Sequence, residues 1–175
     1  MKKMYWIFVA VAVAIVVGVF VAIKADSEPN KTADNIILEK SYINYAWGFQ
    51  YNGTVICDNG NMYSFKKMDR KKYENACENL NDLQNYILSG DAEFVNKVIN
   101  QDLKQMKTYM ESINNAEYTE VASGGNDIGT QIIYLWKQDK NERILLRETG
   151  DWNRENTNEN TKALIELVEK YIKKD

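Results

Sequence analysis

The chain has 175 residues, of which 45% are apolar, and a formal net charge of −3. It contains no histidine, which excludes Ser-His and Cys-His catalysis and zinc sites built on imidazole. When Lys2, Lys3 and Lys24 are set aside, 19 basic and 25 acidic residues remain. This acidic balance argues against a nucleic-acid partner, because phosphate binding needs a basic surface.

Residues 5–23, YWIFVAVAVAIVVGVFVAI, contain no charge and no side-chain amide. A helix of this length, rising about 1.5 Å per residue, covers the ~30 Å hydrocarbon core of a bilayer. Lys2 and Lys3 precede it and acidic residues soon follow it, so we expect the N-terminus in the cytoplasm and the rest of the chain outside. A signal peptide cleaved at Ala25, which would give a secreted protein, is the alternative.

Residues 25–35 hold the only proline and show no apolar periodicity, which is typical of a tether. We therefore divide the chain into a single-pass membrane anchor at 1–24, a tether at 25–35 and one extracytoplasmic domain at 36–175.

The first part of this domain predicts three strands. Residues 41–51 alternate in the manner of a strand, with four aromatic residues on one face: Tyr45, Trp47, Phe49 and Tyr51. Asn52-Gly53 and the segment 58–61 carry turn signals, which bound a second strand at 54–57 and a third at 62–65.

Helical spacing follows in two segments, 69–89 and 91–114, and we expect these helices to form an antiparallel pair. The rest of the chain predicts three more strands, a polar loop at 151–158 and a terminal helix capped by Asn158 or Thr157; the strands cover 118–122, 130–137 and 143–148. The predicted order is βββ-αα-βββ-α, without strand-helix-strand repeats. This order favours an α+β domain with an antiparallel sheet.

Three segments carry a family resemblance: Trp47-Gly48-Phe49-Gln50, the turn and strand at 58–65, and Gly150-Asp151 followed by Asn156-Thr157. With them, residues 40–172 resemble small exported, membrane-anchored proteins of low-GC Gram-positive (clostridial-type) bacteria. The resemblance implies export and the fold, and it transfers no activity and no catalytic residue.

Cys57 and Cys77 are the only cysteines. Outside the membrane they are a candidate disulfide, and closing a loop of about 20 residues would stabilise the fold by roughly 3 kcal/mol. The alternative is two separate thiols, because both positions also suit an apolar core.

The aromatic residues Tyr45, Trp47, Phe49 and Tyr51 have two interpretations as well. They form the core face beneath the helices, or they form an exposed platform that stacks against a sugar or peptide ligand. They are the candidate ligand-binding residues.

Four residues of the polar loop and helix start resemble an oxygen-ligand calcium loop: Asp151, Asn153, Glu155 and Glu159. The match fails at Asn156 and Lys162, where such a loop needs glycine and an acidic residue, so we predict no metal site and no cofactor.

No nucleophile-elbow motif occurs in the sequence. We expect a binding module at the cell surface that is held by residues 5–23 and recognises a cell-wall component or a protein. The alternatives are an exported hydrolase that uses Asp58, Asp151 or Glu155, and an accessory subunit of a membrane complex.

Overall fold

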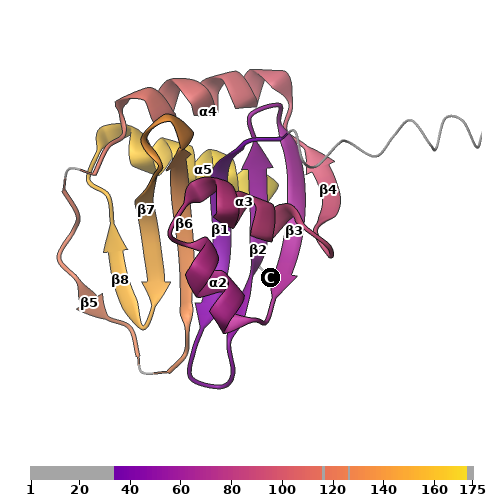
Figure 1. Cartoon of the computed structure of the whole chain (residues 1–175). Coiled ribbons are helices and arrows are strands. Elements are labelled where there is room, and N and C mark those ends of the chain that lie inside the picture. Colours follow the sequence, from indigo (N-terminus) through magenta and orange to yellow (C-terminus); the bar gives the residue numbers. More distant parts are fainter. Residues whose placement is uncertain (1–33, 116, 126, 173–175) are drawn as a thin grey trace, which may run out of the picture. The chain divides into compact units, whose positions relative to one another are not determined.

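An antiparallel sheet runs through the centre of the computed structural model, which describes residues 34–115, 117–125 and 127–172 (Figure 1). Its strands are β1 (Ile36–Asn44), β2 (Gln50–Cys57), β3 (Asn61–Lys67), β4 (Glu93–Lys97), β5 (Ala122–Ser123), β6 (Thr130–Lys137), β7 (Glu142–Gly150) and β8 (Trp152–Glu155). Seven of these strands form the sheet of the described region in the order β4-β3-β2-β1-β6-β7-β8. The two-residue β5 extends the sheet by pairing with β8.

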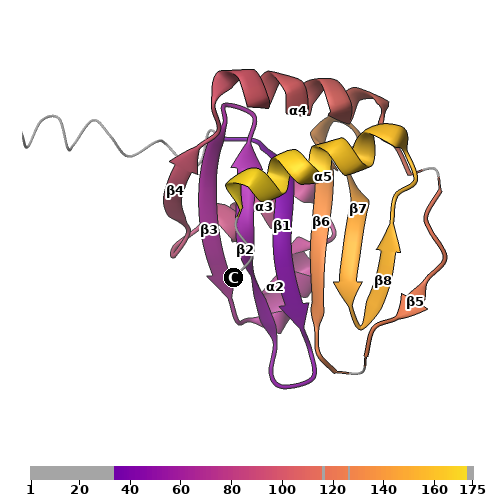
Figure 2. The same cartoon turned by 180° about the vertical axis from the view of Figure 1, so that it is seen from behind.

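Helices cover both faces of the sheet (Figures 1 and 2). On one face lie α2 (Arg70–Ala76) and α3 (Leu80–Leu88); α4 (Asn100–Ser112) and α5 (Glu159–Tyr171) pack on the other. A short 3-10 turn, η2 (Gln138–Lys140), joins β6 to β7. The described residues all belong to one compact unit.

The sheet separates two apolar cores, because successive side chains of a strand point to opposite faces. The core beneath α4 and α5 contains Leu38, Ile56, Met62, Leu135, Met106 and Leu164. The core beneath α2 and α3 contains Ile43, Tyr51, Val55, Tyr63, Leu83 and Trp136. At about 25 cal/mol per Å² of apolar surface removed from water, these two layers supply the main stabilising contribution.

The α+β class and the antiparallel sheet are confirmed. β6 has the bounds predicted for it, the segment 143–148 lies within β7, and the Asn158 side chain accepts the N–H of Asn160 at the start of α5. The helix expected over 69–89 is divided into α2 and α3, because the Asn79 side chain caps a new helix through the N–H of Asn81.

The single strand expected over 41–51 is wrong, since this segment is a hairpin. β1 ends at Asn44, residues 45–49 turn the chain, and β2 begins at Gln50. Gly48 has φ +94°, which glycine adopts without a steric cost, so it permits the reversal. The alternation of large and small residues continues through the turn and conceals it.

The helix expected over 91–114 is also wrong in its first part. Residues Glu93–Lys97 form β4 and pair with β3, and α4 begins only at Asn100. Pairing with a sheet edge overrides the helical spacing of the apolar residues here. The expected helix pair does not form, because α3 and α4 pack on opposite faces of the sheet.

The observed order is therefore βββ-αα-β-α-ββββ-α. In the segment 118–122 only Ala122 belongs to a strand, while Tyr118 forms an isolated bridge with Asn156. The predicted loop at 151–158 contains β8, which pairs with β7.

The membrane anchor expected at 1–24, and the tether apart from its last two residues, lie outside the described residues. Among the residues that the structure describes, no helix has the length and apolar character needed to cross a bilayer.

Candidate functional site

The sheet face beneath α4 and α5 changes from apolar to polar along its strands. Neighbouring residues of β6, β1, β2 and β3 form three rows across this face. The first row is apolar and buried: Leu135, Leu38, Ile56 and Met62. The second is mixed: Ile133, Lys40, Thr54 and Ser64. The third is polar: Gln131, Tyr42, Asn52 and Lys66.

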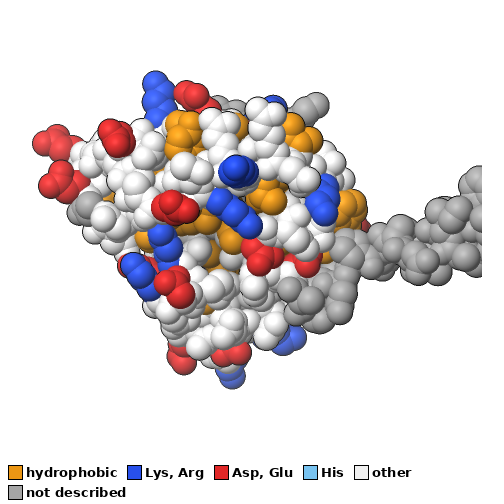
Figure 3. Space-filling view, turned by 90° about the horizontal axis from the view of Figure 1, so that it is seen from above, with side chains coloured by type: hydrophobic (Ala, Val, Ile, Leu, Met, Phe, Trp, Pro, Cys, Tyr) orange, Lys and Arg blue, Asp and Glu red, His pale blue; other side chains and the backbone are white. Residues whose placement is uncertain are grey.

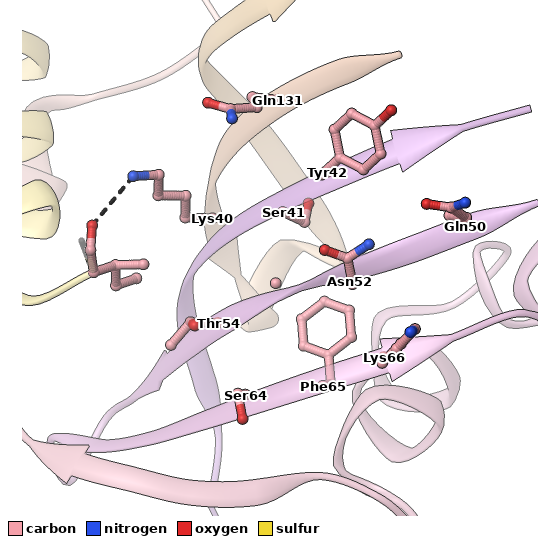
Figure 4. Close-up of a pocket in the computed structure, with 12 residues that line it drawn as sticks. Lys40, Ser41, Tyr42, Gln50, Asn52, Thr54, Ser64, Phe65, Lys66 and Gln131 are labelled. Atoms are coloured by element: carbon pink, nitrogen blue, oxygen red, sulfur yellow. Dashed lines mark hydrogen bonds between the residues drawn. The ribbon is translucent and has the colours of Figure 1, made fainter. Parts of the chain in front are cut away.

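The third row and the polar residues of the second row line a groove of about 500 Å³ next to the C-terminal end of α5. We call this site the sheet groove and define it by Lys40, Tyr42, Gln50, Asn52, Thr54, Ser64, Lys66 and Gln131. Figure 2 shows α5 crossing one end of the sheet, and Figure 4 shows Tyr42, Asn52 and Gln131 on three adjacent strands.

Most polar side chains of the sheet groove have no protein partner among the residues that the structure describes. Within the described part of the chain, the side chains of Gln50, Asn52, Thr54, Ser64 and Gln131 make no hydrogen bond. The Tyr42 hydroxyl is an exception, since it donates to the carbonyl of Ile128 at 3.0 Å and accepts from Asn44 Nδ2 at 2.8 Å. The groove thus offers several hydroxyl and amide groups to a ligand.

The two lysines of the groove differ in their surroundings. The Lys40 ammonium donates to the carbonyl of Ile172 at 3.2 Å (Figure 4). It also lies 4.0 Å from Glu169 Oε1. It therefore holds the C-terminal end of α5, where carbonyl groups attract a cation. Lys66 is exposed, and its ammonium forms no ion pair with any described residue.

No carboxylate lines the groove among the described residues, so its fixed charge is positive. Elsewhere the surface is mixed: seen from above, over α4, basic and acidic side chains are interspersed (Figure 3). The groove is therefore suited to a ligand that is polar along its length and carries a negative group near Lys66.

Gly53 lines the groove at a point where the backbone of β1 lies very close to it. A Cβ at this position would lie 2.3 Å from the carbonyl oxygen of Lys40 and 2.7 Å from the Cα of Ser41. Both are backbone atoms, so a side chain would force the strands apart and change the groove.

The opposite face contains a buried acidic residue. Glu39 is 0% exposed and accepts hydrogen bonds from Ser41 Oγ at 2.6 Å, Tyr51 Oη at 2.7 Å and Trp136 Nε1 at 3.0 Å. Arg143 Nη1 lies 3.5 Å from Glu39 Oε2. Burial, together with the Glu39 carboxylate, raises the pKa of Tyr51 well above its ordinary value. Because both carboxylate oxygens are occupied, we assign this cluster to the stability of the fold.

The four candidate aromatic residues are divided by the structure and do not line the groove. Trp47 is 79% exposed and Tyr45 50%, whereas Tyr51 is 1% exposed and belongs to the core. The half-buried Phe49 ring lies 5.5 Å from Tyr45 and 5.2 Å from Tyr73 of α2. Tyr51 is therefore a core residue, whereas Trp47 and Tyr45 are exposed on the surface.

Cys57 and Cys77 are free thiols in the structure and are not joined by a disulfide. Cys57 is buried on β2, and Cys77 caps the C-terminus of α2. Burial raises the pKa of both thiols above the ordinary value, which lowers their nucleophilic reactivity.

The acidic residues considered for hydrolysis do not converge. Asp58 follows β2, whereas Asp151 precedes β8 and Glu155 ends it, and three strands separate β2 from β8. Asp151 Oδ1 accepts the N–H of Ile128 at 2.9 Å. Within the described residues, no three Cys, Asp or Glu side chains are placed to hold a metal ion.

Comparisons with protein-family models, with curated proteins and with solved structures find no match for this chain. The sequence reasoning missed the groove residues Tyr42, Asn52, Lys66 and Gln131. In the sequence these residues are visible only as polar residues at alternate positions of separate strands. The register of the strands is what brings them into one row.

Proposed function

We propose that this protein is a membrane-anchored binding module of the cell surface whose ligand lies in the sheet groove. The observation that carries the proposal is the groove lined by polar side chains, most of which have no protein partner among the described residues. Ligand sites are concave and hold a few polar groups that converge on the ligand, and this groove has both features, which supports a binding role.

The chemistry of the lining defines the ligand. Asn52 and Gln131 each supply both donors and acceptors, Thr54 and Ser64 supply hydroxyls, and Lys66 supplies a charge. A hydroxyl-rich and amide-rich ligand with an acidic group matches this lining. A fragment of an acidic cell-wall glycan has these properties.

The row is long enough to favour an extended ligand. Gln131, Tyr42, Asn52 and Lys66 belong to four adjacent strands. With a strand spacing of about 4.8 Å, the row spans roughly 14 Å. A ligand that follows it can contact the amides and the Lys66 ammonium at the same time.

The location rests on the anchor predicted at 5–23 and on the acidic residues that follow it. The N-terminal charge bias supports a domain outside the cell, where wall polymers are accessible. The resemblance to exported Gram-positive proteins supports this location.

The proposal is tested with the full-length protein in detergent by recording thermal unfolding against acidic glycan fragments, neutral glycan fragments and peptides. At about 100 times its dissociation constant, a ligand stabilises the protein by roughly 2.7 kcal/mol, which raises the melting temperature by several degrees. We expect the acidic glycans to give the largest shift.

Variants in the groove locate the effect. Asn52→Ala and Lys66→Ala should reduce the ligand-induced shift, whereas Lys71→Ala, an exposed lysine on α2 at the opposite face, should leave it unchanged. A shift that survives both groove variants would place the ligand elsewhere, and the absence of any shift across the panel would reject this ligand class.

A further inference from the structure

Tyr42 is the only aromatic residue among the eight that define the sheet groove, and its side chain is held in one position. Its hydroxyl donates to the Ile128 carbonyl at 3.0 Å and accepts from Asn44 Nδ2 at 2.8 Å. Asn44 is fixed in turn, because its Oδ1 accepts the N–H of Ala46 at 2.8 Å. These bonds use the proton and one lone pair of the hydroxyl, so the ring is the main part of Tyr42 that remains for a ligand.

Gly129 gives the Tyr42 ring its place. A Cβ at Gly129 would lie 2.4 Å from Tyr42 Oη and 2.7 Å from Cζ, so the hydroxyl end of the ring packs directly on the glycine backbone. The rest of the side chain is partly exposed and lines the groove. Because the ring is fixed before binding, a ligand that packs on it pays little entropy to order it.

Two amides flank the ring. The strand register places Asn52 of β2 and Gln131 of β6 directly opposite Tyr42, one on each side (Figure 4). Side chains that face each other in this way are about 5 Å apart at Cβ. Each amide both donates and accepts, as does a sugar hydroxyl, and the C–H groups on one face of a pyranose ring pack on an aromatic ring. The three side chains together fit one neutral sugar ring.

The positive charge lies farther along the same row. Lys66 of β3 is directly opposite Asn52, so two strand spacings, roughly 10 Å, separate it from Tyr42. Its ammonium forms no ion pair with any described residue, whereas the Lys40 ammonium is held by the Ile172 carbonyl. The separation is longer than one sugar ring. An acidic group at Lys66 and a ring packed on Tyr42 therefore belong to different sugar units of one ligand.

We propose that the sheet groove contains two subsites: Tyr42, Asn52 and Gln131 bind a neutral sugar ring, and Lys66 binds the carboxylate of a neighbouring sugar. The inference rests on the glycan-binding function proposed above, and it names the ligand class more closely. The ligand is a glycan in which neutral and acidic sugars alternate.

The test measures dissociation constants by titration calorimetry with the full-length protein in detergent. The probes are a tetrasaccharide of alternating N-acetylhexosamine and hexuronic acid, and its carboxyl-reduced form, in which each carboxylate is a hydroxymethyl group. The wild-type protein should bind the acidic form roughly tenfold more tightly. Lys66→Gln should remove this preference, because only the acidic form uses the ammonium.

Variants of the neutral subsite should act on both probes alike. Tyr42→Leu should weaken each form about tenfold and keep their ratio, and Tyr42→Phe, which retains the ring, should lose less. Asn52→Ala should also weaken both forms, and it leaves the contacts that hold the Tyr42 ring intact. Lys71→Gln, on α2 at the opposite face, is the matched control for Lys66→Gln and should change neither constant. Circular dichroism checks that each variant is folded.

The outcomes separate the two levels of the proposal. If both probes bind but Lys66→Gln keeps the preference, or if Tyr42→Leu and Asn52→Ala leave both constants unchanged, the two-subsite arrangement is wrong while glycan binding itself stands. If the wild-type protein binds neither tetrasaccharide, the proposed function fails and this inference fails with it.

Discussion

The buried Glu39 carboxylate allows a quantitative test of how the sheet is held beneath α2 and α3. Glu39→Gln keeps the shape of the side chain and removes its charge. The Ser41 and Tyr51 hydroxyls, which donate to Glu39, can rotate and accept hydrogen bonds from the amide of the new glutamine. Both hydrogen bonds are then kept, with donor and acceptor reversed. The principal loss is the negative partner of Arg143, whose side chain is only 17% exposed.

Removing one partner of a buried ion pair costs about 3–5 kcal/mol. We expect the lower end of this range, about 3 kcal/mol, because the Arg143 guanidinium keeps its contact with the Tyr134 ring, 4.6 Å from the ring centre. For a domain with a total stability of about 5–15 kcal/mol, this is a large fraction.

The assay is urea unfolding of the full-length protein in detergent, with the midpoint and the slope fitted separately. Glu111→Gln, an exposed residue of α4, is the control and should change the unfolding free energy by less than about 0.5 kcal/mol. The double variant E39Q/R143M should lose less than the sum of the two single variants, because it leaves no unpaired charge. A loss below about 1 kcal/mol for Glu39→Gln, or full additivity in the double variant, would refute this account.

Three further predictions concern stability. Gly53→Ala should cost about 2 kcal/mol or more in the same urea assay, since the added Cβ meets backbone atoms; an unchanged midpoint would contradict this. Trp47→Ala should change the unfolding free energy by less than about 0.5 kcal/mol, because the side chain is 79% exposed, and a larger loss would show that it packs against the domain. A hydrogen bond from Lys170, and to a smaller extent one from Tyr171, hold the pKa of Asp102 below its ordinary value of 3.8. The ionised Asp102 therefore stabilises the fold above pH 3.8, and this contribution is lost as the pH falls through the lowered pKa. Asp102→Asn should therefore reduce the loss of stability between pH 5 and pH 2, and an unchanged acid dependence would argue against this contact.

The elements that could be predicted from the sequence are those with strong local signals. β6 is a run of β-branched and aromatic residues between turn signals, and Asn158 precedes a clear helical stripe at the start of α5. The Asn59-Gly60 turn also forms as expected, with Gly60 at φ +86°.

Elements that depend on tertiary contacts could not be predicted in this way. Phe94, Val95, Val98 and Ile99 fit a helical spacing as well as a short strand, and the free edge of β3 decides between the two. The sequence pattern does not reveal the turn at residues 45–49. Large residues occupy every second position from one strand through the turn into the next, so the segment has the pattern of one continuous strand.

The sheet groove was invisible for a related reason. On each strand alone, residues such as Asn52 or Gln131 resemble an ordinary solvent-facing position. Their common row depends on the pairing of β6, β1, β2 and β3, and sequence patterns do not specify this register across long separations.

The most direct test of the central claim is a map of backbone hydrogen exchange in the full-length protein with and without an acidic glycan fragment. We expect slower exchange on ligand addition in β1, β2, β3 and β6 around Tyr42, Asn52 and Lys66, with no change in α2. Protection confined to the hairpin at residues 45–49 or to α2, with the groove strands unaffected, would contradict it.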